Sequence, residues 1–291
     1  MDQKSSKFIN SSLIAALLLA VFLWTTISQN ASSDTVTSTA EVNFLDVGQG
    51  DAILVNLPGS VQALIDGGPD SRVLNQLVRY MPKFDKKIEY VFASHPDADH
   101  IGGLPSVLQS YEVGEFVETG KTSDSQVFKK MKNEVSQKKI AVKTIRQGDM
   151  VDLSGKAKME VLYPDENAVK SATTNNVSEV MRFYYQGGTV MFTGDAEVET
   201  MDKILSSEPK DKIKSDILKV PHHGASSAYD QKFLEEVAPE FVVISVGKNN
   251  KYGHPAEVVL NALKSLNAKI FRIDELGTIS FVWSGGNWVE K

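Results

Sequence analysis

The chain has 291 residues, of which 42% are hydrophobic and 23% charged, so it is long enough to bury a core and has the composition of an ordinary globular protein. A formal net charge of −6 argues mildly against a protein that binds nucleic acid through an overall basic surface, but it does not exclude a nuclease, because a local basic strip or a bound metal can outweigh the net charge. The absence of cysteine excludes disulfides, thiolate metal ligands and an acylated cysteine anchor. Any metal site must therefore consist of histidines and carboxylates.

The first 40 residues read as a targeting segment. Lys4 and Lys7 precede an apolar run over residues 8–27, which has about the length that a bilayer requires, and acidic residues follow it. This charge order predicts a cytoplasmic N-terminus and a domain outside the cytoplasm. We expect a signal-anchor or single transmembrane helix over residues 1–30, a flexible linker over 31–40 and one domain over 41–291. The alternative is a cleaved signal peptide and a secreted domain, although no clear cleavage site is present.

In the remaining chain, short apolar stretches alternate with amphipathic ones. Strands are predicted over residues 40–48, 52–57, 62–68, 88–95, 141–146, 158–164, 179–186, 189–195 and 215–224. Helices are predicted over residues 71–81, 104–111, 128–139 and 198–207. The stretches that complete this mixed α and β pattern are 230–239, 241–247, 255–267, 269–274 and 278–283. No repeat of fixed period is visible, which favours a single domain.

Polar residues stand directly after several of these strands. They are Asp46, Asp66, His95, Asp195, His222 and His223. A side chain in this position leaves the sheet at its edge, where several loops can meet. The pattern therefore predicts one shared site.

The densest cluster of such residues is ASHPDADHIGGL, residues 93–104. His95, Asp97, Asp99 and His100 form an H-x-D-x-D-H pattern in it. A tight loop of this kind can direct His95 and Asp97 to one ion, and Asp99 and His100 to a second. The alternative is a capped turn with Asp97 or Asp99 as the helix N-cap, which leaves the paired histidines without a role.

Seven motifs spread over residues 44–255 carry a family resemblance: FLDVGQGDAILV, LIDGG, SHPDADHIGGL, NNVSEVMRF, FTGDAE, LKVPHHGAS and ISVGKNNKYGHP. Their order resembles the metallo-β-lactamase superfamily, and within it the ComEC-like branch. The resemblance implies an α/β fold, the four-layer αββα sandwich, with a metal site along one edge of the two facing sheets.

The resemblance also implies the metal ligands, which are His95, Asp97, Asp99, His100, Asp195 and His254. Asp97 stands where most of the superfamily has a second histidine, and Asp195 matches the aspartate that bridges two ions. Asp99 is also placed to orient or deprotonate water. His254 matches a late histidine near the second ion.

One departure from the superfamily is that no histidine lies between His100 and His222. The segment NNVS occupies the region of the missing ligand, which leaves Asn176 and Ser178 as weak ligands or substrate contacts. Either His222 or His223 would complete a site, and the other would act on the substrate. Fewer imidazoles and more carboxylates favour manganese or magnesium over zinc, although zinc stays a candidate.

Other polar residues of these motifs have two readings each. Asp46 and Asp51 either orient metal ligands or form turns of a glycine-rich loop, and Asp66 fixes the turn beneath the metals. Lys219 either neutralises a phosphate or is a solvated surface lysine. Lys248, together with Lys251, makes the KNNKYGHP segment a candidate phosphate-binding loop.

Together these features predict a membrane-anchored, extracytoplasmic hydrolase with two divalent ions, manganese or zinc, with magnesium as a further candidate. Its expected substrate is a phosphodiester such as DNA, cleaved by a metal-activated water, with Asp99, His222 and His223 in catalytic roles. The membrane is the other expected partner, and the sequence shows no sign of a stable protein partner. The alternatives are hydrolysis of a small ester, lactone or β-lactam, and a metal-binding sensor domain without catalysis.

Overall fold

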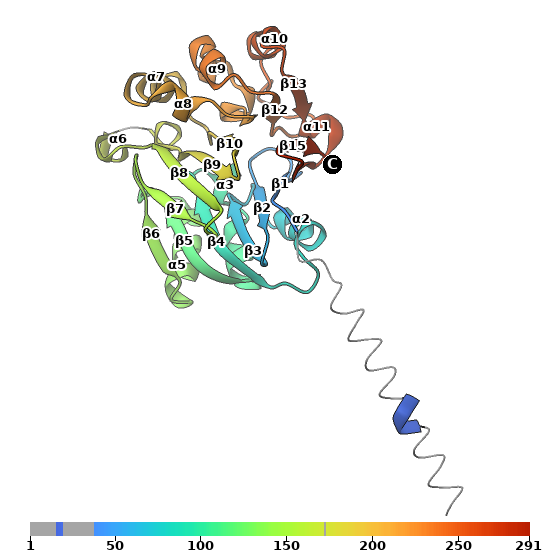
Figure 1. The fold of residues 1–291 in the computed structure, drawn as a ribbon. Coiled ribbons are helices and arrows are strands. Elements are labelled where there is room, and N and C mark those ends of the chain that lie inside the picture. The colour runs from blue at the N-terminus through green and yellow to red at the C-terminus, as the bar shows by residue number, and fades with distance from the viewer. Residues whose placement is uncertain (1–15, 20–37, 172) are drawn as a thin grey trace, which may run out of the picture. The chain divides into compact units, whose positions relative to one another are not determined.

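The computed structural model describes residues 16–19, 38–171 and 173–291 (Figure 1). Within these ranges, one sheet consists of β1 (Glu41–Phe44), β2 (Ile53–Leu57), β3 (Val61–Ile65), β4 (Lys87–Ala93), β5 (Glu112–Glu118), β6 (Ala141–Thr144), β14 (Ile279–Ser284) and β15 (Asn287–Glu290). The other sheet consists of β7 (Met150–Asp152), β8 (Ala157–Tyr163), β9 (Val180–Tyr185), β10 (Gly188–Phe192), β11 (Ile217–Lys219), β12 (Phe241–Ile244) and β13 (Lys269–Arg272). The strand orders are β15-β14-β1-β2-β3-β4-β5-β6 and β13-β12-β11-β10-β9-β8-β7.

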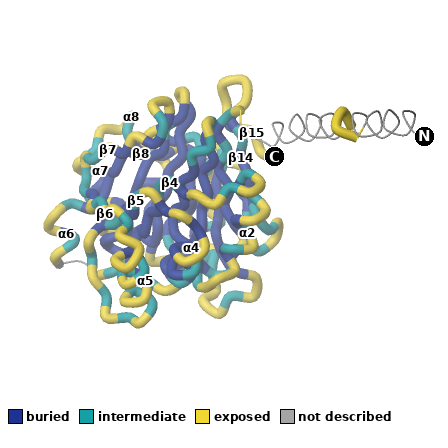
Figure 2. Tube along the Cα trace, turned by 90° about the horizontal axis from the view of Figure 1, so that it is seen from below, coloured by how far each residue is buried: buried dark blue, intermediate teal, exposed yellow. Residues whose placement is uncertain are grey.

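The α-helices of the domain lie outside the two sheets. They are α2 (Arg72–Tyr80), α3 (Ala98–Ile101), α4 (Leu104–Ser110), α5 (Gln126–Gln137), α6 (Glu166–Ser171), α7 (Val198–Ser207), α8 (Lys210–Ile213), α9 (Gln231–Val237), α10 (Glu257–Ser265) and α11 (Ile273–Leu276). Short 3₁₀ helices are η1 (Asn175–Val177), η2 (Pro221–Gly224) and η3 (Ser226–Ala228). Figure 2 shows the strands buried at the centre and exposed segments around them.

Three buried apolar clusters define the layers. The central cluster joins the inner faces of both sheets, and it includes Phe44 and Phe281 from one sheet and Phe183 from the other. A second cluster packs α2, α4 and α5 on the outer face of the eight-stranded sheet, and a third packs α7, α9 and α10 on the seven-stranded sheet. Strands covered on both faces need no polar alternation, and β2 and β10 are buried at every position. The predicted mixed fold with two facing sheets is confirmed.

The strands that lead to the polar residues are parallel within each sheet. The ladders β3–β4–β5–β6 and β10–β11–β12–β13 are parallel throughout. Their carboxyl ends therefore meet at one edge of each sheet, which is where ligand sites form in such folds. Asp66 follows β3, His95 follows β4, Asp195 follows β10, and the histidine pair follows β11.

Three strands of the described chain, β5, β7 and β15, were absent from the predicted pattern, and β5 is the longest of them. β5 lies between β4 and β6, yet its sequence EVGEFVE carries three glutamates and a glycine. Gly114 is required there because a Cβ would lie 2.7 Å from the carbonyl oxygen of Glu89 on the neighbouring strand. A glycine inside a strand marks such a close backbone approach, but it weakens the sequence signal for a strand.

The predicted hydrophobic helix over residues 1–30 lies almost wholly outside the described residues. Residues 16–19 form one helical turn, and residues 31–37 of the predicted linker are also outside the described ranges. Among the parts of the chain that the structure describes, no helix has the length and apolar character needed to cross a bilayer.

Candidate metal centre

The H-x-D-x-D-H segment connects β4 to α3. His95 follows the end of β4 by two residues, and Asp99 and His100 lie in α3. Asp97 is the N-cap residue of α3, but its carboxylate makes no capping hydrogen bond. A capped turn therefore does not account for the motif.

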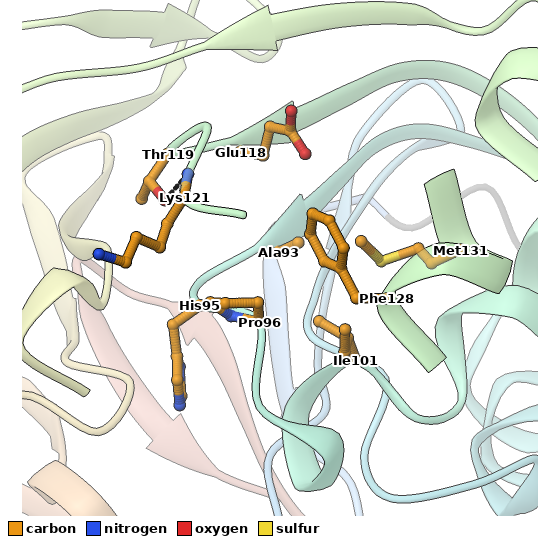
Figure 3. A pocket seen from close by; sticks show the side chains of 9 residues that line it. All are labelled: Ala93, His95, Pro96, Ile101, Glu118, Thr119, Lys121, Phe128 and Met131. Atoms are coloured by element: carbon orange, nitrogen blue, oxygen red, sulfur yellow. Dashed lines mark hydrogen bonds between the residues drawn. The ribbon is translucent and has the colours of Figure 1, made fainter. Parts of the chain in front are cut away.

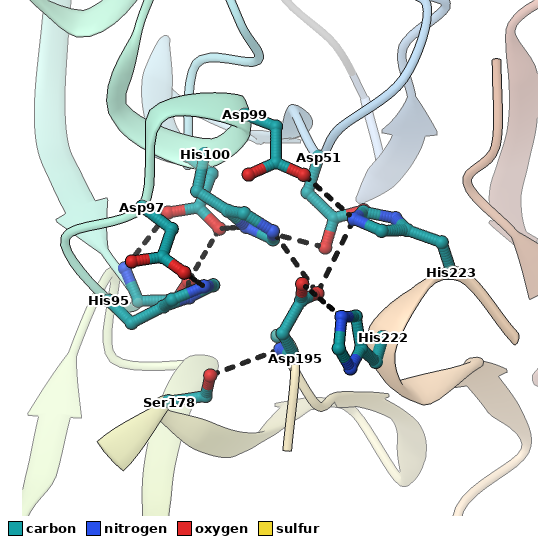
Figure 4. A network of polar contacts seen from close by, with 12 residues as sticks. Asp51, His95, Asp97, Asp99, His100, Ser178, Asp195, His222 and His223 are labelled. Carbon is teal, nitrogen blue, oxygen red and sulfur yellow. Dashed lines mark hydrogen bonds and ion pairs between the residues drawn. The ribbon is translucent and has the colours of Figure 1, made fainter. Parts of the chain in front are cut away.

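Four side chains from three separate segments converge beyond the strand ends, and Figure 4 shows them around Asp195. His100 Nε2 lies 3.1 Å from Asp195 Oδ1, and His223 Nε2 lies 3.5 Å from the same oxygen. His223 Nε2 is also 3.4 Å from Asp99 Oδ2. One donor atom from each of these side chains lies within 4.8 Å of every other. We call Asp99, His100, Asp195 and His223 the four-ligand group.

The buried atoms of this group have no hydrogen-bond partners. Asp195 Oδ1 and the Nε2 atoms of His100 and His223 are enclosed but form no hydrogen bond. Leaving a buried polar atom unsatisfied costs about 1–3 kcal/mol. A divalent cation held between these atoms would remove that cost, and carboxylate with imidazole is a ligand set that such cations accept. The residues present therefore fit a metal ion.

His95 and Asp97 form a looser pair beside the four-ligand group. His95 Nε2 is buried without a hydrogen bond and lies 3.8 Å from Asp97 Oδ2, which accepts a hydrogen bond of 3.2 Å from Thr174 Oγ1. The ring centroids of His95 and His100 are 4.1 Å apart, so the pair adjoins the four-ligand group. Among the described residues, however, the pair belongs to no set of three or more donor atoms that all lie within 4.8 Å.

Hydrogen bonds at the opposite ring nitrogens turn the imidazoles of the four-ligand group toward Asp195. His100 Nδ1 lies 2.8 Å from Asp66 Oδ2, and His223 Nδ1 lies 2.7 Å from the carbonyl oxygen of Ser245. Both partners only accept, so each Nδ1 carries the donated proton. When a metal ion takes the place of any proton on Nε2, each imidazole would direct the Nε2 lone pair into the group, as metal-binding histidines do.

His95 is oriented in the same way through Ser94. The Ser94 hydroxyl donates to Asp66 Oδ2 over 2.6 Å, and Ser94 Oγ lies 3.0 Å from His95 Nδ1. Because the single hydroxyl proton goes to Asp66, His95 Nδ1 must be the donor in the second contact. Asp66 thus braces His100 directly and His95 through Ser94.

Lys219 lies inside the site, which differs from both predicted readings. It is fully buried, and its Nζ lies 2.5 Å from Asp51 Oδ2 and donates to the carbonyl oxygen of Gly194 over 2.7 Å. The same Nζ is 3.8 Å from Asp195 Oδ1. Lys219 is therefore neither a solvated lysine nor a substrate contact, and its charge offsets part of the buried carboxylate charge.

The structure separates the two aspartates of the DVGQGD motif. Asp51 is buried, and its oxygens lie 3.7 Å from the Nδ1 atoms of both His100 and His223. Asp46 is exposed and accepts a hydrogen bond from the backbone N–H of Gly48, as a turn residue does. Gly50 brings the loop against α3, because a Cβ at this position would lie 2.1 Å from the carbonyl oxygen of Asp99.

Charges within the metal-free site oppose one another. At His100, burial disfavours the charged form, but the carboxylates of Asp195 and Asp66 outweigh it and raise the pKa well above 6.5. Burial and the charge of His100 lower the pKa of His95 well below 6.5. At Asp195, the neighbouring imidazoles outweigh burial and hold the pKa well below 3.8. A proton on His100 therefore faces Asp195 where a metal ion would otherwise bind.

The group opens into a cavity of about 180 Å³. The residues that line it are Gln49, Asp97, Asp99, Asn175, Asp195, His222, His223, Tyr252 and His254. His222 Nε2 lies 3.5 Å from Asp195 Oδ2, and His222 Nδ1 lies 3.4 Å from Glu197 Oε1. The His254 ring is 6.0 Å from that of His222, so His254 reaches the cavity but not the four-ligand group. Among the described residues, the structure thus brings His223, rather than His254, into the four-ligand group.

The predicted substrate contacts take different places. Asn176 points to α7, where it donates to Glu199 and accepts from Thr200, and Ser178 is buried and accepts from the backbone N–H of Asp195. Lys248 is exposed but is not part of the cavity wall.

Three cavity residues, Gln49, Asn175 and Tyr252, were not singled out from the sequence. Each lies inside a motif already recognised, so the missing information was the direction of single side chains. The 3₁₀ turn of η1, for example, places Asn175 on the cavity and turns its neighbour away.

The backbone of η2 is strained at both histidines. His222 and His223 have φ values of 46° and 54°, the left-handed region that residues other than glycine rarely adopt. The His222 N–H donates to the carbonyl oxygen of Gly194, which ties η2 to the loop that carries Asp195. Strain of this kind persists where the surrounding structure enforces it, and it concentrates at functional sites. Here it turns two consecutive imidazoles toward one carboxylate.

A second cavity near His95 has a different character. It is about 10 Å³ in volume, room for roughly one water molecule, and Phe128 and Met131 form its apolar wall. Figure 3 shows the His95 ring pointing away from these two side chains. This cavity is too small for a substrate, so the larger cavity at the four-ligand group is the candidate active site.

Two curated proteins share sequence with most of this chain. The chain is 29% identical to ComE operon protein 3 of Bacillus subtilis (strain 168), over 84% of this chain and 33% of that protein. It is 26% identical to competence protein ComA of Neisseria gonorrhoeae, over 83% of this chain and 32% of that protein. The chain therefore spans about a third of the length of these curated relatives.

The fold is also found among solved structures. The metallo hydrolase Igni18 from Ignicoccus hospitalis KIN4/I superimposes with a TM-score of 0.57 at 16% identity, covering 84% of this chain and all of that one. A family model described as the metallo-beta-lactamase superfamily matches residues 45–248. The resemblance seen in the motifs is confirmed, and the chain belongs to the metallo-β-lactamase superfamily.

Proposed function

We propose that this chain is a metal-dependent phosphodiesterase of the nuclease type. The observation that carries the proposal is the four-ligand group, whose unbonded buried atoms lie at the wall of an open cavity. Membership of the superfamily supports metal-dependent hydrolysis, and the likeness to two competence proteins supports nucleic acid as the substrate.

Two sets of side chains would hold divalent ions. The four-ligand group would hold one ion, and His95 with Asp97 would hold a second. When bound, such ions supply a nucleophile by lowering the pKa of water, and they offset the charge that develops on phosphoryl oxygens. The three carboxylates favour manganese or magnesium, whereas the three imidazoles also suit zinc.

Among the cavity side chains, His222 is the best placed to move a proton. Its ring is partly exposed, and Glu197 lies behind Nδ1, where a carboxylate orients an imidazole for proton transfer. Ser227 Oγ donates to the same Glu197 oxygen and holds the carboxylate in place. His222 would protonate the leaving oxygen, whereas His223 is occupied in the four-ligand group. Asp99 belongs to that group as well, so its role is that of a ligand that positions the nucleophile.

The test is hydrolysis by full-length protein that has been stripped of metal and reloaded with manganese, magnesium or zinc. We expect cleavage of single-stranded DNA and of a bis-aryl phosphodiester, with manganese at least as effective as zinc. Hydrolysis of a β-lactam, lactone or carboxylic ester, without cleavage of DNA, RNA or the model diester, would assign the chain to the alternative substrate class. Tight metal binding without hydrolysis of any of these substrates would indicate a sensor domain.

Residue roles are tested with a matched pair of variants. His222→Gln should lower the rate for DNA, where the leaving oxygen needs a proton, more than for a nitrophenyl diester, whose leaving group needs none. Ser206→Ala is the control, because Ser206 is an exposed residue of α7 whose hydroxyl bonds only to the helix backbone. Equal losses for both substrates would remove His222 from the role of acid.

We further propose that residues 1–30 anchor the chain in a membrane, residues 31–40 form a linker and the hydrolase domain lies outside the cytoplasm. The support is the basic lead and the apolar run in the sequence. Protease added to intact cells should then degrade the domain. Full protection until the cells are lysed would overturn the proposed orientation.

A further inference from the structure

The cavity has an aromatic residue at its rim that the proposed chemistry does not use. Tyr252 is 59% exposed, and its ring stacks on His254 with a centroid distance of 5.8 Å and an interplanar angle of 15°. Both residues line the cavity of the four-ligand group. A tyrosine that packs into a core is buried, and this one presents ring surface to solvent beside the candidate active site.

The loop that carries Tyr252 is held by one side chain. Asn250 Nδ2 donates to the carbonyl oxygens of Gly247 and His254, and its Oδ1 accepts from the backbone N–H groups of Tyr252 and His254. Asn249 has a φ of 57°, which places the turn where an asparagine is tolerated. The ring is therefore presented by a preorganised turn, which lowers the entropy lost when it contacts a ligand.

A series of rings connects the four-ligand group to this rim. Centroid distances are 5.4 Å from His100 to His223, 6.2 Å from His223 to His222 and 6.0 Å from His222 to His254. Tyr252 is the outermost member of the series. A group that stacks on Tyr252 thus lies at the rim of the cavity that His222 and Asp195 also line.

Cations accompany the ring. Lys251 Nζ lies 5.6 Å from the centroid of Tyr252, and both Lys251 and Lys248 are exposed. A flexible lysine at this distance can turn from the ring to a phosphate at little cost. An aromatic face with adjacent lysines is the arrangement with which proteins bind strands of nucleic acid whose bases are unpaired.

We infer that Tyr252 is a specificity-determining residue that stacks the nucleobase next to the scissile phosphodiester. The inference rests on the proposed phosphodiesterase function. It states that Tyr252 determines which phosphodiesters the protein prefers. A diester without a base next to the cleaved bond gains nothing from Tyr252. A base held in a duplex would have to leave its stack first, so a single strand should be preferred.

The test combines a protein variant with a matched substrate change. Full-length protein and its Tyr252→Leu variant are assayed with manganese on an oligothymidylate and on the same strand with an abasic residue next to the cleaved bond. Loss of one base–aromatic stack weakens binding roughly 5- to 150-fold. We expect Tyr252→Leu to raise KM for the normal strand by a factor in this range, to leave kcat nearly unchanged and to add no loss for the abasic strand. Tyr252→Phe should retain the wild-type KM, because the ring and not the hydroxyl is required.

A direct readout comes from 2-aminopurine placed next to the cleaved bond, since stacking quenches its fluorescence. Rapid mixing should show quenching before cleavage with the wild-type protein and with Tyr252→Phe, but not with Tyr252→Leu. Phe84→Ala is the control for loss of an exposed aromatic ring, because Phe84 is 90% exposed and precedes the start of β4, at the end of the strand opposite His95.

The outcomes separate this inference from the proposed function. If the wild-type protein cleaves the strands and Tyr252→Leu matches it in KM and quenching, Tyr252 has no such role while the phosphodiesterase assignment stands. Equal losses on normal and abasic strands would likewise overturn the inference. Failure of the wild-type protein to cleave any strand would refute the proposed function itself.

Discussion

The two sides of the candidate metal centre differ in the number of side chains that hold them and in how these are braced. In the four-ligand group, every donor atom lies within 4.8 Å of the others, and both imidazoles are fixed at Nδ1 by Asp66 or by the Ser245 carbonyl. The His95–Asp97 pair has only two donors, and their atoms lie 3.8 Å apart. Metal affinity depends on the number of ligands and on the hydrogen bonds that orient them.

The pKa shifts of Asp99 and Asp97 also distinguish the four-ligand group from the His95–Asp97 pair. The His223 contact and the nearby imidazoles outweigh burial and lower the pKa of Asp99, whereas burial raises the pKa of Asp97. Without a metal, the surroundings of Asp99 therefore stabilise its carboxylate form, whereas those of Asp97 disfavour it. We therefore expect the four-ligand group to bind a metal ion first and the His95–Asp97 pair to bind one second.

The largest effect is expected for Asp195→Asn, which alters the carboxylate next to both sides. Replacing one oxygen by an amide nitrogen should lower metal affinity and hydrolysis by at least about 100-fold, because changes to residues that only orient ligands already cost 10–100-fold. Metal content after dialysis and the hydrolysis rate are the measurements. Asp46→Asn is the control, since this aspartate is exposed in a turn. Wild-type metal content in Asp195→Asn would refute the shared centre.

A pair of single variants tests the order of loading. His223→Ala removes a member of the four-ligand group, so calorimetric titration should lose the tighter of two binding events. Asp97→Ala should lose only the weaker event and keep one equivalent of metal. If Asp97→Ala loses the tighter event instead, the comparison between the two sides is reversed.

A third pair of variants tests the residues that hydrogen-bond to the candidate metal ligands. Asp66→Asn weakens the acceptor for His100 Nδ1 and for Ser94, and the expected loss of metal affinity is 10–100-fold, in proportion to other changes at such positions. Thr174→Val removes one hydrogen bond from a hydroxyl to the partly exposed carboxylate of Asp97, which water can replace, and should cost less, about fivefold. A larger loss in Thr174→Val than in Asp66→Asn would show that the looser pair controls affinity.

The candidate metal centre also shows which features could be predicted from the sequence. The H-x-D-x-D-H spacing, the aspartate after β10 and the histidines after β11 predicted which loops meet, because the carboxyl ends of parallel strands share an edge. The choice between His223 and His254 was not open to prediction. It depends on left-handed backbone at His222 and His223, which the sequence PHHG does not specify.

Lys219 and β5 illustrate the two kinds of missing information. A lysine before PHHG reads as solvated until its partner is known, and that partner, Asp51, lies 168 positions earlier in the chain and 2.5 Å away in space. β5 has no apolar alternation because Gly114 serves a close approach of backbones. Long-range pairing and backbone proximity are properties of the fold, so local patterns do not contain them.

The smallest expected effect concerns a carboxyl behind the His95–Asp97 pair. Glu179 is fully buried, both of its side-chain oxygens lack hydrogen bonds, and its N–H donates to the carbonyl oxygen of Ser94. Burial, together with repulsion by Asp66 and Glu118, raises the pKa of Glu179 well above 4.5. The folded chain then keeps a proton that the unfolded chain releases above about pH 4.5.

The sign of the pH dependence follows from this difference in bound protons. The native state binds more protons, so stability from the neutral carboxyl is full below the unfolded pKa and is lost as pH rises toward the raised native pKa. Glu179→Gln has no proton to lose, so the free energy of unfolding of the variant relative to the wild type should increase with pH above about 4.5. Urea denaturation of metal-free protein at a series of pH values measures this slope, and an offset common to all pH values reports only the new amide. Glu166→Gln is the control: Arg146 and Lys170 lower the pKa of this exposed glutamate, so its difference should fall as pH rises toward about 4.5 and stay constant above it. If the difference between Glu179→Gln and the wild type stays constant with pH, Glu179 ionises as freely in the folded chain as in the unfolded one. The surroundings of the His95–Asp97 pair would then carry one more negative charge than the structure indicates.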